Sequence, residues 1–204
     1  MCYCREQHHH AIVMPMHRIL IILLAGMSIA LSGCATLSRD ECKSGDWHKI
    51  GVQDGNDGRL PERFKQHGKA CELDRSEASK AAYTAGREKG LAIYCTQVRG
   101  YREGALGQKY LGACPAQSAG QFLSGYEFGK RIYQTERRSS DVANEIFAVS
   151  QKLQSPKLPN AEREPLLQEQ SRLQTEDVRL KKELEQLRTQ ADTLVAAARK
   201  KKKN

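Results

Sequence analysis

Four cysteines in the body of the chain offer the first candidate chemistry: Cys42, Cys71, Cys95 and Cys114. An even number of cysteines favours two disulfides if the chain reaches an oxidising compartment. A metal site is the competing interpretation, because His67 and Cys71 would share a helix face and His48 lies near Cys42. No Cys-x-x-Cys pair is present and the spacings match no structural zinc module. We therefore expect disulfides, no metal and no catalytic thiol.

The residues before these cysteines indicate an oxidising compartment. Residues 1–15 fit no part of a signal peptide, whereas Met16-His17-Arg18 makes a short basic start, so Met16 is the expected initiator. Residues 19–30 are almost wholly apolar, which suits a signal peptide and falls short of the roughly 20 residues that span a bilayer. The segment ends in Leu31-Ser32-Gly33-Cys34, which resembles the lipobox read by the bacterial lipoprotein signal peptidase.

This resemblance implies that the Cys34 thiol takes a diacylglyceryl group, that residues 1–33 are removed, and that the new amino group is acylated. Several acyl chains make a stable anchor, because each buried methylene contributes about 0.8 kcal/mol. Ala35 stands after the cysteine in place of Asp, which under the sorting rule of enteric-type bacteria implies the outer membrane, facing the periplasm. An ordinary secretory leader with a chance cysteine is the alternative.

Geometry limits how the four cysteines can pair. A straight helix from Ser76 to Tyr94 would be about 28 Å long. Cys71 and Cys95 would then lie near opposite ends of it, whereas a disulfide needs Cα atoms within about 7 Å. Pairing Cys42 with Cys71 and Cys95 with Cys114 remains, as does the crossed alternative, and we favour the first.

Acid, base and calcium chemistry are weakly supported. Asp54-Gly55-Asn56-Asp57-Gly58 resembles the start of an EF-hand loop, but its glycine comes one position early and Lys65 stands where the bidentate Glu belongs, so we expect a turn. Asp54 and His67 could serve an enzyme as acid and base, and Arg59 could contact an anion or pair with Asp57. No nucleophile motif or phosphate loop accompanies them. We therefore expect neither an enzyme nor a cofactor.

Glycines and aromatics recur at helical spacing. The pattern is Tyr83-x-x-Gly86-x-x-x-Gly90-x-x-x-Tyr94, a looser Tyr101-x-x-Gly104-x-x-Gly107-x-x-Tyr110, and Phe122-x-x-Gly125-x-x-x-Gly129-x-x-x-Tyr133. Glycine costs up to about 1 kcal/mol in a helix interior, so its repeated use on one face indicates closely packed helix backbones flanked by aromatics. Loops in a glycine-rich disulfide fold are the alternative.

Several motifs also occur in the order found in a known family. They are Trp47-His48-Lys49-Ile50-Gly51, Asp54-Gly55, Gly58-Arg59, His67-Gly68-Lys69-Ala70-Cys71, Tyr83-Thr84-Ala85-Gly86-Arg87-Glu88-Lys89-Gly90-Leu91, Tyr94-Cys95, Gly104, Tyr110 and Cys114-Pro115. Roughly residues 38 to 134 resemble the proteobacterial lipoproteins grouped as domain of unknown function 2799. The resemblance implies an envelope location and domain boundaries, and it brings no established activity.

One ligand site can be proposed within this region. Gly86-Arg87-Glu88-Lys89-Gly90 is its densest polar segment. An exposed Arg87 beside Tyr83 and Tyr94 could bind a carboxylate or a glycan by charge and stacking. The alternative is a solvated helix face above a packed glycine seam.

The C-terminal part is predicted to form a helical arm. Ser139-Ser140-Asp141 would cap an amphipathic helix that ends before the break at residues 155–160. Beyond it, a heptad seam consists of Leu166, Leu173, Leu180, Leu187 and Leu194, adjoined by Leu184, Ala191 and Ala198. Gln170 and Asp177 weaken its first half. This segment would fold back on residues 141–154 as a hairpin or pair with another chain.

The chain is thus expected to be mainly α-helical. We predict a signal peptide over 1–33, a lipidated tether over 34–46, a disulfide-stabilised domain over 47–138 and a coiled-coil arm over 139–204. Five positive charges of the net +9 lie in the run 199–203, which we interpret as a solvated helix end, and we expect no nucleic-acid partner. A structural or protein-interaction lipoprotein, associating through the arm, is the leading hypothesis. A binding module for a cell-wall glycan or anionic ligand is the alternative.

Overall fold

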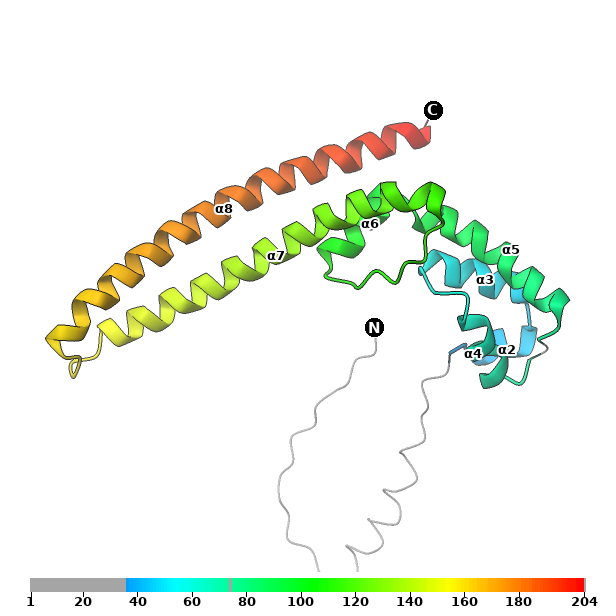
Figure 1. Ribbon diagram of the computed structural model, residues 1–204, viewed down its shortest axis with the longest axis horizontal. Coiled ribbons are helices and arrows are strands. Elements are labelled where there is room, and N and C mark those ends of the chain that lie inside the picture. The colour runs from blue at the N-terminus through cyan, green and yellow to red at the C-terminus, as the bar shows by residue number, and fades with distance from the viewer. Residues whose placement is uncertain (1–35, 74, 204) are drawn as a thin grey trace, which may run out of the picture.

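The computed structural model describes residues 36–73 and 75–203, which form helices and no strand (Figure 1). The helices are α2 (Arg39–Ser44), α3 (Trp47–Asn56), α4 (Arg63–Ala70), α5 (Glu77–Tyr94), α6 (Gln97–Ala105), α7 (Ala116–Leu153) and α8 (Asn160–Lys203). This confirms the predicted fold class. The predicted leader and the lipobox residues Leu31, Ser32, Gly33 and Cys34 lie outside the described residues.

Helices α3 and α5 form a parallel pair with glycines at their contact. A Cβ on Gly51 would overlap the carbonyl of Tyr83, and a Cβ on Gly55 would overlap that of Arg87. In return, Gly86 lies against the carbonyl of His48. The contacts advance in the same direction along both helices, which makes the pair parallel. The predicted close packing of helix backbones is therefore confirmed here.

Helices α6 and α7 repeat this arrangement. Gly100 and Gly104 of α6 face the carbonyls of Phe122 and Tyr126 on α7. Gly125 and Gly129 of α7 face those of Gln97 and Tyr101 on α6 in return. The glycines have the same spacing in both pairs, so the chain contains two copies of one structural unit. Only Tyr101 and Gly104 of the looser Tyr101 to Tyr110 pattern lie in a helix, because α6 ends at Ala105.

A glycine and a tyrosine close the C-terminal end of each pair. Gly58 follows α3 with φ +65°, and the Tyr94 ring of α5 covers it. Gly107 follows α6 with φ +66°, and the Tyr133 ring of α7 covers it. Residues with a side chain rarely adopt this backbone conformation, and a Cβ at either position would also overlap the tyrosine ring. Both positions therefore require glycine for two independent reasons.

A disulfide fixes the N-terminal end of each pair. Cys42 in α2 joins Cys71 after α4, with Cα atoms 5.3 Å apart, and Cys95 joins Cys114 with Cα atoms 5.6 Å apart. Each bridge thus links the segment before the first helix of a pair to the segment before the second. The favoured pairing is confirmed, and the capped helix α5 does separate Cys71 from Cys95.

The two units meet through stacked aromatic rings. Tyr94 at the end of α5 lies 4.9 Å from Phe122 of α7 between ring centroids, nearly parallel to it. Tyr110 adds a third ring at 4.7 Å from Phe122. The Cys95–Cys114 disulfide belongs to the same buried cluster.

The C-terminal arm is a long antiparallel hairpin of α7 and α8 (Figure 1). The predicted cap at Ser139-Ser140-Asp141 is wrong, because α7 runs without interruption from Ala116 to Leu153. Its buried Val142 and Val149 pack with Leu173 and Leu180 of α8, which holds this part of α7 in the hairpin without a new helix start. The break after Leu153 is confirmed, and α8 folds back as the hairpin alternative predicted.

The predicted heptad seam forms the inner face of this hairpin. Leu173, Leu180 and Leu187 are buried, with Leu184 and Ala191 beside them. The contact of this seam with α7 reaches beyond residues 141–154, the segment against which it was predicted to fold. Leu187 and Ala191 pack on Ile132, next to Tyr101 and Phe128 of the second unit. Arg138 forms an ion pair with Glu176 across the hairpin and another with Glu145 on its own helix. Among the described residues, no helix is long and apolar enough to cross a bilayer.

Candidate functional site

Three buried polar side chains meet where α3, α4 and α5 come together. Oδ2 of Asp54 lies 2.9 Å from Nε2 of His67 and accepts a 2.7 Å hydrogen bond from the Tyr83 hydroxyl. A carboxylate only accepts hydrogen bonds, which assigns the ring proton of His67 to Nε2. Burial, followed by the hydrogen bond to Asp54, raises the pKa of Tyr83, so this hydroxyl remains a donor. The network ties α4 to the α3–α5 pair of the first unit.

Asp54 and His67, the acid and base considered from the sequence, are therefore in contact, but both are buried away from any substrate. Only 1% of His67 is exposed, and its Nδ1 is buried without a partner. A catalytic base must come within hydrogen-bond reach of a substrate proton. The arrangement is a buried structural network, and its geometry gives no support to catalysis by Asp54 and His67.

Asp54 also borders a small polar cleft of about 380 Å³ beside residues 36–38. Arg59 and Arg63 line it together with Glu41 and Asp57. Because acidic and basic groups are mixed there, the cleft prefers neither sign of charge. The anion contact predicted for Arg59 gains no support from this setting.

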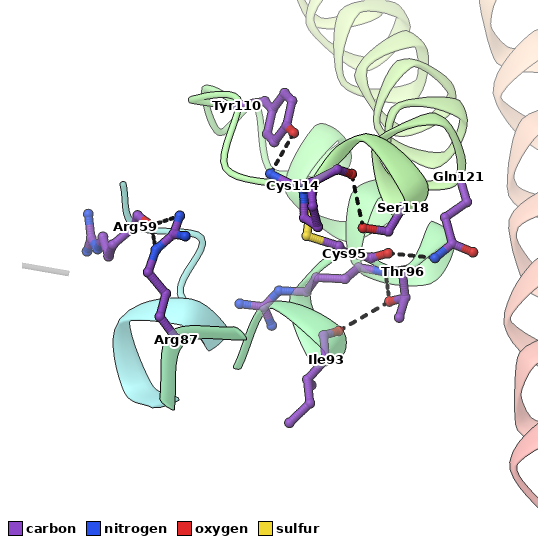
Figure 2. Close-up of a disulfide and its surroundings, with 11 residues drawn as sticks. Arg59, Arg87, Ile93, Cys95, Thr96, Tyr110, Cys114, Ser118 and Gln121 are labelled. Carbon is purple, nitrogen blue, oxygen red and sulfur yellow. Dashed lines mark hydrogen bonds between the residues drawn. A yellow bond between two sulfur atoms is a disulfide. The ribbon is translucent and has the colours of Figure 1, made fainter. Parts of the chain in front are cut away.

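The structure does not assemble the predicted stacking site of Arg87, Tyr83 and Tyr94. Tyr83 is 1% exposed and Tyr94 is 5% exposed, so neither ring is available to a glycan. The Arg87 guanidinium donates two hydrogen bonds, of 2.9 and 2.7 Å, to the carbonyl oxygen of Arg59 (Figure 2). Both rings belong to the buried core, and the arginine side chain is bonded to the backbone of its own chain. The sequence could not show these contacts, because they depend on how the helices pack.

Tyr126 occupies the position of Arg87 in the second unit. Its hydroxyl donates a 2.8 Å hydrogen bond to the carbonyl of Gln108, which comes after Gly107 as Arg59 comes after Gly58. A cationic and a phenolic side chain thus satisfy equivalent carbonyls. The repeated glycine spacing was the sequence signal that could have revealed this correspondence.

The Cys95–Cys114 disulfide is held by backbone and side-chain hydrogen bonds (Figure 2). The Gln121 amide donates to the Cys95 carbonyl at 2.8 Å, and the Cys114 N–H donates to the Tyr110 hydroxyl at 3.0 Å. Cys95 and Cys114 are both buried. This disulfide is therefore built into the junction of the two units.

A cleft of about 810 Å³ opens between α4 and the start of α5. Phe64 and Tyr83 contribute its apolar wall, and Lys65, Lys69 and Arg75 lie around it. Helix α4 carries no acidic residue, and within the described part of the chain none of these three cations forms an ion pair. Sequence reasoning missed this site, since the spacing of Lys65 and Lys69 resembles any solvated helix face.

Metal chemistry finds no support in the described residues. No group of three histidine, cysteine or carboxylate side chains is placed to hold a metal ion there. The turn predicted over Asp54–Gly58 is confirmed only for Asp57 and Gly58, because Asp54, Gly55 and Asn56 belong to the last turn of α3. The sequence also argues against a calcium site here, because the glycine comes one position early and the bidentate Glu of an EF-hand loop is missing.

These features define a class: a mainly helical protein of two disulfide-braced, glycine-seamed helix pairs that continue into a helical hairpin. Residues 46–131, from the start of the first unit into α7, match the family model described as protein of unknown function (DUF2799). This region of the chain is a domain of that family, in agreement with the resemblance noted from its motifs. Searches of curated proteins and of solved structures find no match.

Proposed function

We propose that this protein is a lipid-anchored component of the cell envelope that presents its helical arm to a protein partner. One observation carries the proposal: α7 begins inside the second glycine-seamed unit and continues unbroken to the tip of the arm. At 1.5 Å per residue this helix is about 57 Å long. The arm is therefore a rigid extension of the domain, suited to holding a binding surface at a fixed distance.

The anchor is inferred from the lipobox pattern and from the short segment between Cys34 and the first helix. Helix α2 begins at Arg39, where Ser38 and Glu41 form a capping box, so only a short tether separates Cys34 from the folded domain. The two disulfides fit an envelope compartment, because such bonds persist where conditions are oxidising. Without Asp after Cys34, the outer membrane, facing the periplasm, is the proposed location.

The arm also carries apolar side chains that are largely exposed. Phe147 on α7 is 66% exposed and Val178 on α8 is 67% exposed. Exposed aromatic side chains are favoured anchors at protein interfaces. We place the partner contact on this part of the arm, whether the partner is another protein or a second copy.

The anchor is tested by intact-mass spectrometry of the protein purified from its membrane fraction, with and without reductant. The expected mass is that of residues 34–204 plus acyl chains, with four hydrogens gained on reduction. A Cys34→Ser variant should lose the acyl mass and leave the membrane fraction. An unacylated native product would overturn the anchor.

The arm is tested by photo-crosslinking in cells, with a photoreactive residue placed at Phe147 or Val178. The matched control is Ile93 of α5, which is 62% exposed and lies outside the arm. Discrete adducts from the arm positions and none from Ile93 are expected. Adducts at twice the mass of the chain identify self-association, and equal labelling from all three positions would contradict the proposal.

A further inference from the structure

The basic cleft between α4 and α5 lies at the tethered end of the domain. Leu37 and Leu73 pack against the aromatic cluster of Trp47, Phe64 and Tyr83, and two of those rings also line the cleft. Leu37 comes three residues after Cys34, a span of at most about 11 Å even when fully extended. The cleft is thus connected to the proposed anchor through one packed cluster.

The first disulfide prevents α4 from moving away from that end. Cys42 in α2 is bonded to Cys71, which is the residue that caps the C-terminus of α4. Lys69 lies two residues before this bond. Lys65 and Lys69, which both belong to α4, are therefore held beside the tether.

The cleft combines an apolar wall with positive charges that form no ion pair among the described residues. Lys65 and Lys69 are four residues apart on α4 and border the same cleft, and Arg75 borders it too, with its stem over Gly68 of α4. Lys80, on α5, is paired with Glu77 at 3.5 Å and Glu62 also borders the cleft, so cations still outnumber acids. Phe64, Pro61 and Tyr83 supply apolar surface. Such a site fits an anion that carries an apolar group.

We propose that this cleft binds the phosphate of an anionic phospholipid headgroup, with Lys65, Lys69 and Arg75 as the phosphate contacts. The choice of a lipid rests on the proposed anchor, because acylation of Cys34 would hold the cleft beside a surface rich in such phosphates. Lysine binds phosphate as a point charge, and arginine can bind it through two parallel hydrogen bonds. Binding would hold the domain against its membrane and set the direction of the arm.

Native mass spectrometry of the full chain, purified in a neutral detergent, tests this proposal. The protein is titrated with phosphatidylglycerol, with phosphatidylcholine and with glycerol phosphate. We expect one phosphatidylglycerol to be retained at concentrations where the other two are not. Equal retention of the two lipids, or binding of glycerol phosphate as tightly as the lipid, would overturn the assignment to an anionic lipid.

A charge-matched pair of variants locates the site. Lys65→Glu with Lys69→Glu should weaken phosphatidylglycerol binding by about tenfold or more. Lys152→Glu with Lys157→Glu changes the net charge equally at the tip of the arm and should leave binding unchanged. Equal weakening by both pairs would show unspecific charge attraction and overturn the cleft. Unchanged binding in the first pair would do the same.

The same spectra separate this proposal from the proposed anchor. The acyl mass on residue 34 is read directly from each protein ion, whether or not a lipid is bound. An acylated chain that binds no phosphatidylglycerol overturns the cleft alone. An unacylated chain that binds it through Lys65 and Lys69 overturns the anchor alone.

Discussion

Gly86 on α5 lies directly against the carbonyl oxygen of His48 on α3, so closely that a Cβ on the glycine would overlap it. The obstructing atom belongs to the backbone of a helix and cannot rotate away. Equivalent contacts occur at the other glycines of both seams, and they set the distance between the paired helices. The seam is therefore the feature on which the domain most directly depends.

Gly86→Ala should destabilise the fold, because the added methyl group forces α3 and α5 apart. Overpacking of this kind costs about 1–3 kcal/mol, which exceeds the gain in helix propensity. Gly120→Ala is the matched control, since Gly120 lies in α7 with nothing within 4 Å of an added Cβ. Thermal unfolding should show a lower Tm for the first variant and an equal or higher Tm for the second. A Gly86→Ala protein as stable as wild type would refute the role of the seam.

The two disulfides should each stabilise the protein by about 3 kcal/mol, because each closes a loop of moderate length in the unfolded chain. Replacing Cys95 and Cys114 by alanine should lower the free energy of unfolding by that amount in denaturant titrations. Cys42→Ala with Cys71→Ala provides the comparison at the other unit. If reduction of the wild-type protein changes its stability by less than either double variant, the loss comes from packing and not from the cross-link.

Tyr94 should make the stability fall at alkaline pH. Burial, and then the nearby Glu103, raise the pKa of Tyr94 to about 12 from an ordinary value of 10. The folded protein then holds this proton more tightly than the unfolded chain, so the contribution is complete below pH 10 and is lost as the pH rises to about 12.

Tyr94→Phe keeps the ring over Gly58 and against Phe122 but removes this ionisation. Urea titrations between pH 9 and pH 12 should show a smaller decline in the free energy of unfolding for the variant than for wild type. Tyr133→Phe, at the half-buried equivalent position, is the control for general effects of removing a phenol. Parallel declines in wild type and Tyr94→Phe would contradict the raised pKa.

Leu173→Ala should weaken the arm, because this side chain is fully buried between α7 and α8. Loss of a buried leucine typically costs 2–5 kcal/mol through lost burial and the cavity that remains, roughly the range expected here. Val178→Ala on the same helix, where the side chain is 67% exposed, should change stability by no more than about 0.5 kcal/mol. Hydrogen exchange of α8 should accelerate in Leu173→Ala only. Equal exchange in both variants would mean that the hairpin does not depend on its heptad seam.

The sequence by itself determined the local structure and the covalent framework. Helices follow from periodic apolar residues and their caps, and the length of α5 was enough to exclude a bond between Cys71 and Cys95. The heptad leucines predicted α8 because a side chain every seven residues keeps one face of a helix apolar. The glycine spacing likewise indicated closely packed helices, since glycine has little other reason to recur on one helix face.

Tertiary structure decided which helices pair and which side chains are exposed. The seam joins α3 to α5 and α6 to α7, and no local pattern states that partner choice. Tyr83 and Tyr94 fit a stacking surface or a core equally well by sequence, and only packing placed them inside. Ser139 to Asp141 resemble a cap, but the continuous apolar contacts of α7 with α8 outweigh that local preference. The cleft beside Lys65 and Lys69 depends on an aromatic cluster in which Phe64 of α4 packs with Tyr83 of α5.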